Sequence, residues 1–339
     1  MYRPPRTIFL CLSVLLPASF LFALVFGAVS LPVTDILRTL AGNDGDAMTS
    51  LIVERIRLPR ALLAAAVGAM LGMSGAATQG LFRNPLADPS LIGVTAGAMS
   101  GASIAIVLGG SSIAGYWGLS LVSLGAFAGG VLAVLFVYRL ATGSLGTSVP
   151  TMLLAGIAIS AMAGSFNSFL EFVASNEMLR RISLWKMGGL DGADSVRASI
   201  ALLVTAVVML VIPQRATALN AMLLGESEAR HLGVNVERVK QELICLVAAS
   251  VGVSVALAGS IAFVGLVVPH IVRLIGGPDH RYLLIASGLA GAVLLLLADT
   301  FARTVIAPTE IPAGMVTAAI GAPFFILLLR QKMTLGLNG

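Results

Sequence analysis

Long stretches of this sequence contain no charged residue, and these stretches predict its helices. Asp, Glu, Lys and Arg are all absent from residues 7–34, 61–82, 89–138, 140–170, 198–214, 243–272, 282–298 and 311–329. An apolar stretch of about 20 residues is long enough for one helix to cross a bilayer. The longer stretch at 89–138 fits two helices joined around Gly109–Gly118. The pattern therefore predicts an all-α polytopic membrane protein.

The uncharged stretch at 243–272 has two interpretations. It fits one long helix, or a span followed by a shorter helix after a break near Ala258-Gly259. The first interpretation gives nine spans and the second gives ten. Cytoplasmic loops prefer Lys and Arg, and only ten spans place most of the basic residues on the cytoplasmic side. We therefore predict ten transmembrane helices with both termini cytoplasmic, in a single transmembrane domain over residues 1–339.

Composition supports the membrane assignment. Of the 339 residues, 58% are hydrophobic and only 11% are charged, whereas a soluble domain has about 45–50% apolar and 25% charged residues. This excludes a water-soluble fold and intrinsic disorder. The net charge of +5 gives little reason to expect nucleic acid as a partner, because the basic residues flank predicted membrane helices. The first apolar run is longer than the roughly 7–15 residues of a signal peptide, so a first span is predicted there.

Glycines recur at helical spacing inside the predicted spans. The chain has 37 glycines, well above the usual share of about 7%. Those spaced four apart are Gly68 with Gly72, Gly93 with Gly97 and Gly101, and Gly125 with Gly129. Small residues at this spacing let helix backbones approach closely within a membrane. We therefore expect a tightly packed bundle.

Arginines cluster at the predicted outer end of the second span, in the segment Arg57–Arg60. Lys and Arg are disfavoured on the outer side, so this cluster needs a reason. The side chains could reach lipid phosphates, or they could dock an acidic patch of an external partner. Arg303, at the outer end of the ninth span, has the same two interpretations. For Arg303 a third is an ion pair with Asp299, one helical turn earlier.

Two segments are predicted at the cytoplasmic side. The first, Arg83–Pro89, contains Asn-Pro and Asp-Pro turns and predicts a rigid hairpin between spans. The second is the longest inside loop, about residues 214–241, where Glu226 and Arg230 stand four apart and Gly233 suits a helix C-terminus. This predicts a short helix and a glycine turn beneath the membrane. The helix is either an unused surface element or, as its charge density favours, a docking point for a cytoplasmic partner.

Histidines give weaker signals. His270 follows a proline in the apolar segment Phe263–His270, so a ligand or proton-transfer role is conceivable, but a buried and satisfied histidine is the favoured interpretation. His231 and His280 fall in charged loops and are expected only to face solvent or to cap helices. Cys11 and Cys245 are far apart in sequence and indicate neither a disulfide framework nor a metal site.

The chain contains no recognisable energy-converting motif. Its lysines, Lys186, Lys240 and Lys332, do not follow glycine in a Gly-Lys-Ser/Thr arrangement, so ATP hydrolysis by a P-loop is excluded and we expect no enzymatic activity. Acids inside the predicted spans are limited to Glu171 and Asp299, near span ends. Ion-coupled carriers usually place ionisable groups at mid-membrane, which makes a secondary carrier less favoured. A non-transporting scaffold or receptor is a third class.

Five motifs in one order connect the chain to a known family. They are Arg57-Leu58-Pro59-Arg60, Arg83-Asn84-Pro85-Leu86-Ala87-Asp88-Pro89, Gly225-Glu226 with Ala229-Arg230 and Leu232-Gly233, Phe263-Val264-Gly265-Leu266-Val267-Val268-Pro269-His270 and Gly321-Ala322-Pro323-Phe324. In these motifs the chain resembles the membrane permease of type II ABC importers for iron-siderophores, haem and cobalamin.

The resemblance implies partners. Such a permease pairs with a second permease copy, here expected to be identical, and with two cytoplasmic ATPase subunits that carry the ATP and Mg. A periplasmic binding protein delivers the substrate. The location implied is the bacterial inner membrane, and no resident cofactor or metal is implied in this chain.

The resemblance also implies roles for matching residues. Arg57, Arg60 and Arg303 match arginines that pair with glutamates of the binding protein. Thr147 and Ser148 are the nearest match to the cytoplasmic gate. The ATPase-coupling helix is matched by Gly225, Glu226, Ser227, Glu228, Ala229, Arg230, His231, Leu232 and Gly233.

The substrate implied is haem. The segments Leu179–Gly189 and Glu228–Gly233 look most like haem permeases. Arg180 and Arg181 could attract the propionates of haem as it enters, although ordinary outer-loop charges are an alternative. A ferric siderophore or cobalamin remains the alternative substrate. Axial ligation of haem iron by Met or His along the path is disfavoured, because a transient path should not bind tightly.

Overall fold

The computed structural model is a bundle of helices, and residues 5–27, 29, 31–42, 47–109, 115–144 and 146–336 are described. Within these residues seven helical segments are long and apolar enough to cross a membrane. They contain α1 (Pro5–Val25), α4 (Leu58–Leu81), α6 (Gly115–Ala141), α7 (Val149–Val173), α9 (Ser195–Val211), α12 (Val236–Ala258) and α14 (His280–Ala302). Three apolar helices are shorter: α5 (Val94–Gly109), α13 (Val264–Gly276) and the apolar part of α15 (Ala313–Gly336), which ends at Leu328.

Short elements connect these helices. The α-helical ones are α2 (Val33–Leu40), α3 (Ala47–Leu51), α8 (Asn176–Lys186), α10 (Ala216–Met222) and α11 (Glu226–His231). A π-helical turn, η1 (Ile52–Arg57), leads into α4, and the 3₁₀ turns are η2 (Pro89–Ile92) and η4 (Ile212–Arg215). A two-stranded antiparallel hairpin of β1 (Thr142–Gly143) and β2 (Gly146–Thr147) joins α6 to α7.

The helix boundaries agree with the predicted all-α membrane fold. The long uncharged stretch at 243–272 is broken as the second interpretation requires, because α12 ends at Ala258 and α13 begins at Val264. Gly259 ends α12 with φ +66°, and a Cβ there would meet the carbonyl oxygen of Trp185, so only glycine fits this position. The joint expected around Gly109–Gly118 falls partly outside the described residues. The count of ten spans stays a prediction.

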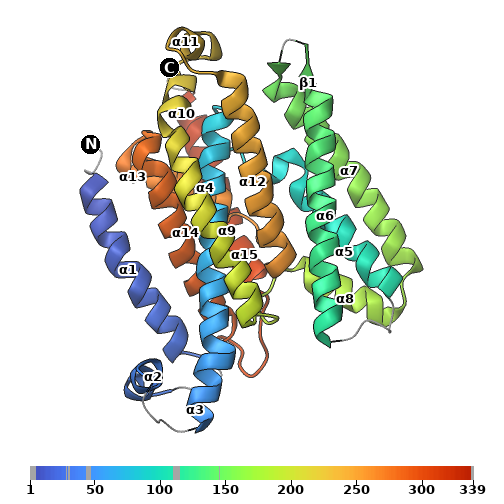
Figure 1. The fold of residues 1–339 in the computed structure, drawn as a ribbon, viewed down its shortest axis with the longest axis vertical. Coiled ribbons are helices and arrows are strands. Elements are labelled where there is room, and N and C mark those ends of the chain that lie inside the picture. The colour runs from blue at the N-terminus through green and yellow to red at the C-terminus, as the bar shows by residue number, and fades with distance from the viewer. Residues whose placement is uncertain are drawn as a thin grey trace.

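Helix α4 occupies the centre of the bundle. It packs against α14, α9, α13 and α12, and nearly all of its residues are buried (Figure 1). A Cβ added at Gly68 or Gly72 would collide with the backbone of α14, and one at Gly75 would collide with the carbonyl oxygen of Gly265 in α13. The predicted close packing through glycines is therefore confirmed along α4.

The same device joins α5 to α6. Gly97 and Gly101 of α5 face Gly129 and Gly125 of α6 at backbone contact. Gly93 is different, because it ends η2 with φ +81° and an added Cβ would find ordinary contacts only. The expectation that Gly93 is a packing glycine was therefore wrong, and its role is to provide a left-handed turn.

The helices fall into two groups. In Figure 1, α5, α6, α7 and α8 lie on one side of α12, whereas α1, α4, α9, α13, α14 and α15 lie on the other. The β1–β2 hairpin and α11 lie at one end of the bundle, and α2 and α3 lie at the opposite end. We call these the α11 end and the α3 end.

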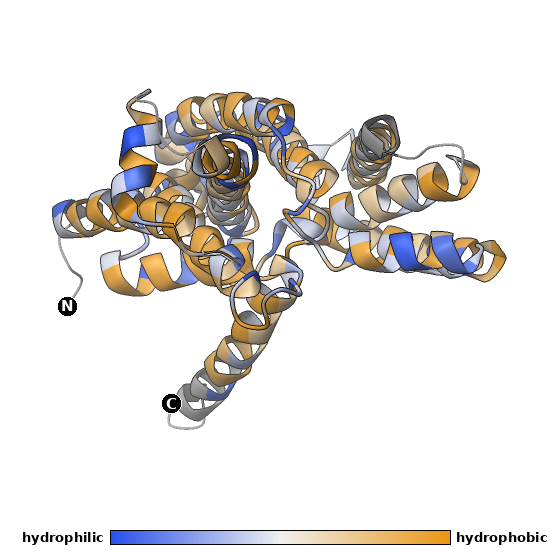
Figure 2. Ribbon diagram, turned by 90° about the horizontal axis from the view of Figure 1, so that it is seen from below, coloured by the Kyte–Doolittle hydropathy of each residue, from blue (hydrophilic) through white to orange (hydrophobic). Residues whose placement is uncertain are grey.

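The outer faces of the bundle are apolar. Figure 2 shows that hydrophobic colouring prevails along the helices, with hydrophilic segments confined to short stretches. Phe172 exposes 87% of its surface and Leu108 exposes 82%. Leaving such side chains in water would cost roughly 1.5–3 kcal/mol each, so a bilayer is the solvent that suits this surface.

The glycine contacts of α4 can be tested with two Gly→Ala substitutions that are expected to change stability in opposite directions. We expect Gly75→Ala to destabilise the protein by roughly 1–3 kcal/mol, because the new methyl group overlaps the backbone of α13. Gly164→Ala in α7 is the control: its Cβ would enter open space, and alanine favours helix over glycine by about 1 kcal/mol. Thermal denaturation of the two variants in detergent, followed by size-exclusion chromatography, measures the difference. Equal midpoints for the two variants would contradict the packing role.

Candidate functional site

The α11 end carries the predicted short helix and glycine turn. Helix α11 spans Glu226–His231, and Gly233 follows it with φ +83°. The Gly233 N–H donates to the Arg230 carbonyl at 2.9 Å, and the Val234 N–H donates to the Ala229 carbonyl at 3.0 Å. These are the bonds of a glycine-terminated helix end. The predicted Glu226–Arg230 ion pair is present at 3.9 Å.

Lys240 attaches α11 to the rest of the bundle. Its Nζ lies 2.7 Å from a Glu226 carboxylate oxygen and donates to the Thr147 carbonyl at 2.8 Å. The Lys240 side chain is only 3% exposed. A buried ammonium group is tolerated only when its protons are paired, so Lys240 at the start of α12 holds α11 and β2 together.

Glu237, one turn earlier on α12, holds the same strand. Its carboxylate accepts from the Thr147 N–H at 3.0 Å and also from the Thr147 hydroxyl. Across the hairpin, the hydroxyl oxygens of Thr142 and Thr147 lie 3.0 Å apart. We call Glu226, Glu237, Lys240 and Thr147 the hairpin network.

The two predicted gate residues differ in environment. Thr147 is buried within the hairpin network. Ser148 is exposed and caps α7, because its side-chain oxygen accepts from the Thr151 N–H at 3.4 Å. Their role as a gate stays a prediction. Sequence reasoning missed Glu237 and Lys240 as functional residues, although two charges three apart at the start of a predicted span were an available signal.

Exposed leucines accompany the charges of the α11 end. Leu224 exposes 69% of its surface and Leu232 exposes 65%. Ser227, Glu228, Arg230 and His231 are exposed around them. Exposed apolar side chains among charges are typical of a protein-docking surface.

At the α3 end, Arg57 binds the end of α1. Its guanidinium donates to the carbonyls of Leu24 at 2.6 Å and Val25 at 2.7 Å, and also to that of Val29. The last carbonyls of a helix lack partners within the helix, and the helix dipole favours a cation there. Arg57 is therefore a C-terminal cap for α1, contributed by a distant segment.

Arg60 and Arg303 share one buried carboxylate. Arg60 donates to both oxygens of Asp299, with Nε at 3.0 Å and Nη2 at 2.9 Å, and its Nη1 donates to Glu310 at 2.8 Å. Arg303 pairs with Asp299 at 3.5 Å and also donates to the Ala23 carbonyl. The Asp299–Arg303 pair considered from sequence is therefore present. We call Arg57, Arg60, Arg303, Asp299 and Glu310 the arginine cluster.

In the arginine cluster, the three arginines predicted to dock a partner protein already bind groups within the chain. All three arginines are buried and contact groups of the chain itself. Their head groups bind carboxylates and carbonyls inside the bundle, which is not the arrangement expected for side chains reaching lipid phosphates. The docking role stays a prediction, and it requires that an internal partner be replaced.

The two arginines predicted to meet haem are separated by the structure. Both lie on α8, where Arg180 is exposed and Arg181 is half-buried. Arg181 lines a cavity of about 350 Å³ together with Trp185, Asp191 and Arg197. Two arginines therefore line one cavity, and Arg180 is not among them.

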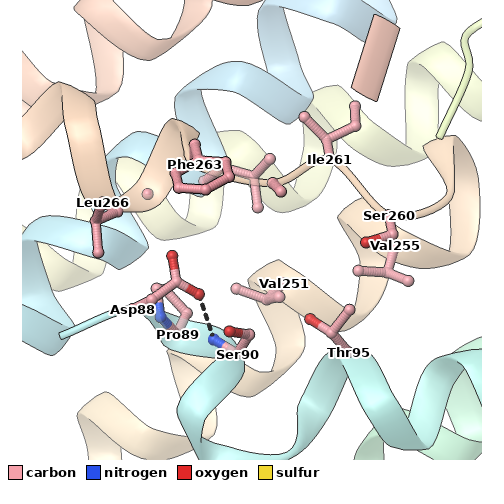
Figure 3. Close-up of a pocket in the computed structure, with 13 residues that line it drawn as sticks. Asp88, Pro89, Ser90, Thr95, Val251, Val255, Ser260, Ile261, Phe263 and Leu266 are labelled. Atoms are coloured by element: carbon pink, nitrogen blue, oxygen red, sulfur yellow. Dashed lines mark hydrogen bonds between the residues drawn. The ribbon is translucent and has the colours of Figure 1, made fainter. Parts of the chain in front are cut away.

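A second cavity lies where two sequence motifs meet. Its volume is about 290 Å³, and the segment after α4 and the segment before α13 enclose it (Figure 3). Asp88 caps η2 by accepting from the Ser90 N–H at 2.8 Å. The predicted hairpin turn is confirmed, since the Asn84 side chain accepts from the Leu86 N–H and Arg83 adopts φ +49°.

This cavity reaches into the middle of the bundle. Leu71, which lines it, lies ten residues before the end of α4, or about 15 Å along the helix. The polar groups of Asp88, Ser90, Thr95 and Ser260 share the lining with apolar side chains. Polar residues at such depth in a membrane protein usually mark a functional path. The sequence showed the two motifs but not that they meet.

The histidines have distinct environments. His270 is buried, as expected, and its ring packs edge-on against Phe324 with centroids 6.3 Å apart. His231 is exposed as expected. The expectation that His280 faces solvent was wrong, because it is buried and its Nδ1 lies 2.9 Å from the Asn220 side-chain oxygen. Within the described residues, no group of three or more His, Cys, Asp or Glu could hold a metal ion.

The turn before α14 is fixed by a carboxylate. Asp279 accepts from the Arg281 N–H at 2.9 Å and from the Asn220 amide at 2.6 Å. Burial on its own would raise the pKa of Asp279, but these hydrogen bonds outweigh it and lower the pKa below its usual value. Asp279 therefore stays ionised and orders the loop between α13 and α14.

Comparison with known proteins places this arrangement in a family. Residues 15–331 match the FecCD transport family. The chain is 41% identical over 332 residues to the hemin transport system permease protein HmuU of Yersinia pestis, covering 97% of each chain. It is 45% identical over 281 residues to the cobalamin import system permease protein BtuC of Halobacterium salinarum, covering 83% of this chain and 74% of the relative.

A solved structure agrees with these relatives. A metal-chelate type ABC transporter in an inward-facing conformation superposes with a TM-score of 0.84 and 31% identity, covering 96% of this chain and 99% of the other. The membrane-suited helices, the order of the motifs and these similarities lead to one conclusion. The chain belongs to the FecCD transport family and is a membrane-spanning permease of the ABC importer class.

Proposed function

We propose that this permease forms the translocation path for haem across the bacterial inner membrane. The observation that carries the choice of haem is the cavity beside α8, which Arg181 and Arg197 both line. Haem carries two propionates, and guanidinium groups bind carboxylates in a bidentate, charge-assisted manner. The similarity to a hemin permease over nearly the whole of both chains supports the choice.

Cobalamin is the second candidate substrate. The similarity to the cobalamin permease is slightly higher in identity but covers less of both chains. A ferric siderophore fits the same class of path. With either alternative the transported substrate differs, but the proposed roles of the ATPase, the binding protein and the second permease copy stay the same.

The α11 end is assigned to the cytoplasm, together with both termini. Leu224 and Leu232 would enter the cleft of an ATPase subunit, and the surrounding charges would orient it. ATP and Mg belong to that partner, and no catalytic residue or cofactor is assigned to this chain. A second copy of the permease would complete the path.

Movement of α11 would reach the path through the hairpin network. Lys240 binds both Glu226 of α11 and the Thr147 carbonyl of β2. A displacement of α11 by the ATPase would therefore be transmitted through Lys240 to β2. Glu237 fixes Thr147 from the other side. The hairpin leads into α7, and in this proposal Thr147 and Ser148 would gate the cytoplasmic exit.

The arginine cluster is assigned to the periplasmic side. There the binding protein would dock through acidic residues that meet Arg57, Arg60 and Arg303. Charge complementarity of this kind sets the orientation and rate of docking more than its strength.

The substrate assignment is tested with the permease, its ATPase and its binding protein reconstituted in liposomes. We expect haem to stimulate ATP hydrolysis more than cobalamin or a ferric siderophore does. Arg181→Gln should reduce haem uptake by roughly tenfold, the effect of about 1.4 kcal/mol, whereas Arg180→Gln, the exposed neighbour, should change it little. Stimulation by cobalamin alone would reassign the cargo, and uptake by the permease alone along an ion gradient would contradict the ABC mechanism.

The docking surface at the α11 end is tested by charge insertion. We expect Leu224→Glu with Leu232→Glu to weaken ATPase association by roughly tenfold or more, because carboxylates would be buried in the interface. Leu40→Glu provides the control, since Leu40 is also exposed but lies at the α3 end. Deleting residues 225–234 should remove association while the spans still insert. Binding affinities in detergent measure both, and unchanged binding by the double variant would refute the surface.

The hairpin network is tested through the coupling of hydrolysis to transport. Lys240→Met removes the link between α11 and β2, so we expect haem uptake per ATP hydrolysed to fall by roughly tenfold, within the usual range of coupling energies. Lys240→Arg should restore part of it. Arg238→Met is the control, because Arg238 is exposed and its guanidinium pairs with Glu242 of the same helix. A normal ratio of uptake to hydrolysis in Lys240→Met would show that the network is structural only.

A further inference from the structure

The arginine cluster contains more positive than negative charge. Three guanidinium groups, those of Arg57, Arg60 and Arg303, face two carboxylates, those of Asp299 and Glu310. Four of these five side chains are almost fully buried, and Arg57 is satisfied by carbonyl dipoles. A buried cluster with one surplus positive charge favours the approach of an additional anion.

Glu310 is the exception among the five. Its side chain is 41% exposed, whereas those of Arg60 and Asp299 are 9% and 2% exposed. Asp299 lies within α14, which packs along α4, but Glu310 lies in the connection between α14 and α15, where residues 305–310 are all exposed. A segment with so little burial is the part of the cluster that moves at least cost.

The geometry of Arg60 divides its donors between the two carboxylates. Asp299 takes the edge of the guanidinium formed by Nε and Nη2, in a bidentate contact. Glu310 takes Nη1 with a single bond at 2.8 Å. A guanidinium has a fixed fork of donors, so a carboxylate arriving from outside would compete for Nη1 and leave the Asp299 contact intact.

We propose that Glu310 is a displaceable latch on Arg60, which an acidic side chain of the binding protein must replace in order to dock. The inference rests on the proposed function of the chain. It explains how buried arginines can serve as a docking site: the partner exchanges one carboxylate for another and exposes no bare charge. Release of Glu310 also frees the connection that leads into α15, so docking is transmitted to that helix.

The same segment also indicates that the anion replacing Glu310 is a carboxylate of a protein. Val305 and Ile306, on the same connection as Glu310, expose 46% and 53% of their surfaces. Exposed apolar side chains on the segment that carries a charged pair match the composition of a protein interface. An anionic lipid head group is the competing occupant, and the experiment below separates the two.

The test compares two variants that remove the same charge. Glu310→Gln removes the competitor from Arg60, and we expect the affinity for the binding protein to rise by about fivefold or more, within the range typical of coupled sites. Glu54→Gln removes an exposed carboxylate from η1, at the same end of the molecule but outside the arginine cluster, and should change affinity by less than about twofold. Glu310→Asp, with a shorter reach, should give an intermediate affinity.

Affinities are measured with the permease in nanodiscs of phosphatidylcholine, with and without phosphatidylglycerol, using the binding protein that supports uptake in liposomes. Tighter binding by Glu310→Gln in both lipids supports the latch. Tightening that phosphatidylglycerol abolishes would assign Arg60 to lipid head groups and overturn it, as would unchanged or weaker binding by a variant with a normal thermal midpoint.

Thermal stability distinguishes a latch from a purely structural role for Glu310. If Glu310→Gln lowers the thermal midpoint, Glu310→Asp decides: an affinity above that of the wild type supports the latch, and one at or below it overturns the latch. If the wild-type permease does not bind the binding protein, the proposed function fails as well. If it binds and the variants do not tighten binding, only the latch fails.

Discussion

Backbone contact between α4 and its neighbours is the constraint on which the rest of the structure depends. In a bilayer, apolar side chains gain little by leaving lipid for protein, so helices associate through close packing and hydrogen bonds. Gly68, Gly72 and Gly75 let α4 touch α14 and α13 without intervening side chains. Both ends of α4 then carry polar contacts to the same neighbours: Arg60 binds Asp299 near the first turn, and Gln79 binds Arg273 near the last. The helix is thus a rigid connection between the two ends of the molecule.

That constraint explains how much of the fold could be predicted from sequence. Charges are costly in a membrane, so the uncharged stretches located the helices, and glycines located the break at Gly259 and the turn after α11. The depth of the segment after α4 could not be predicted. Turn residues look alike in a surface loop and in a loop that returns into the bundle, and only the contact of Pro89 with Gly265 distinguishes them.

The sequence predicted where the candidate sites lie along the chain, but it did not predict which side chains contact one another there. The arginines and the α11 loop stood out because charge is rare in this chain. Their partners did not, because Arg60 and Asp299 are 239 positions apart and Thr147 and Glu237 are 90 apart. His280 shows the same limit: its sequence neighbours are charged, yet its ring is buried beside Asn220. Polarity along the sequence does not reveal which polar groups meet.

The cap that Arg57 provides for α1 affects how this protein can be engineered. Two carbonyls at the end of the first helix, and that of Val29 beyond it, take hydrogen bonds from Arg57, which follows later in the chain. Replacing that helix with an unrelated membrane anchor, or deleting it from the expressed protein, would leave the buried guanidinium of Arg57 without its carbonyl acceptors. N-terminal fusions should therefore be joined ahead of α1 and leave its final turn untouched.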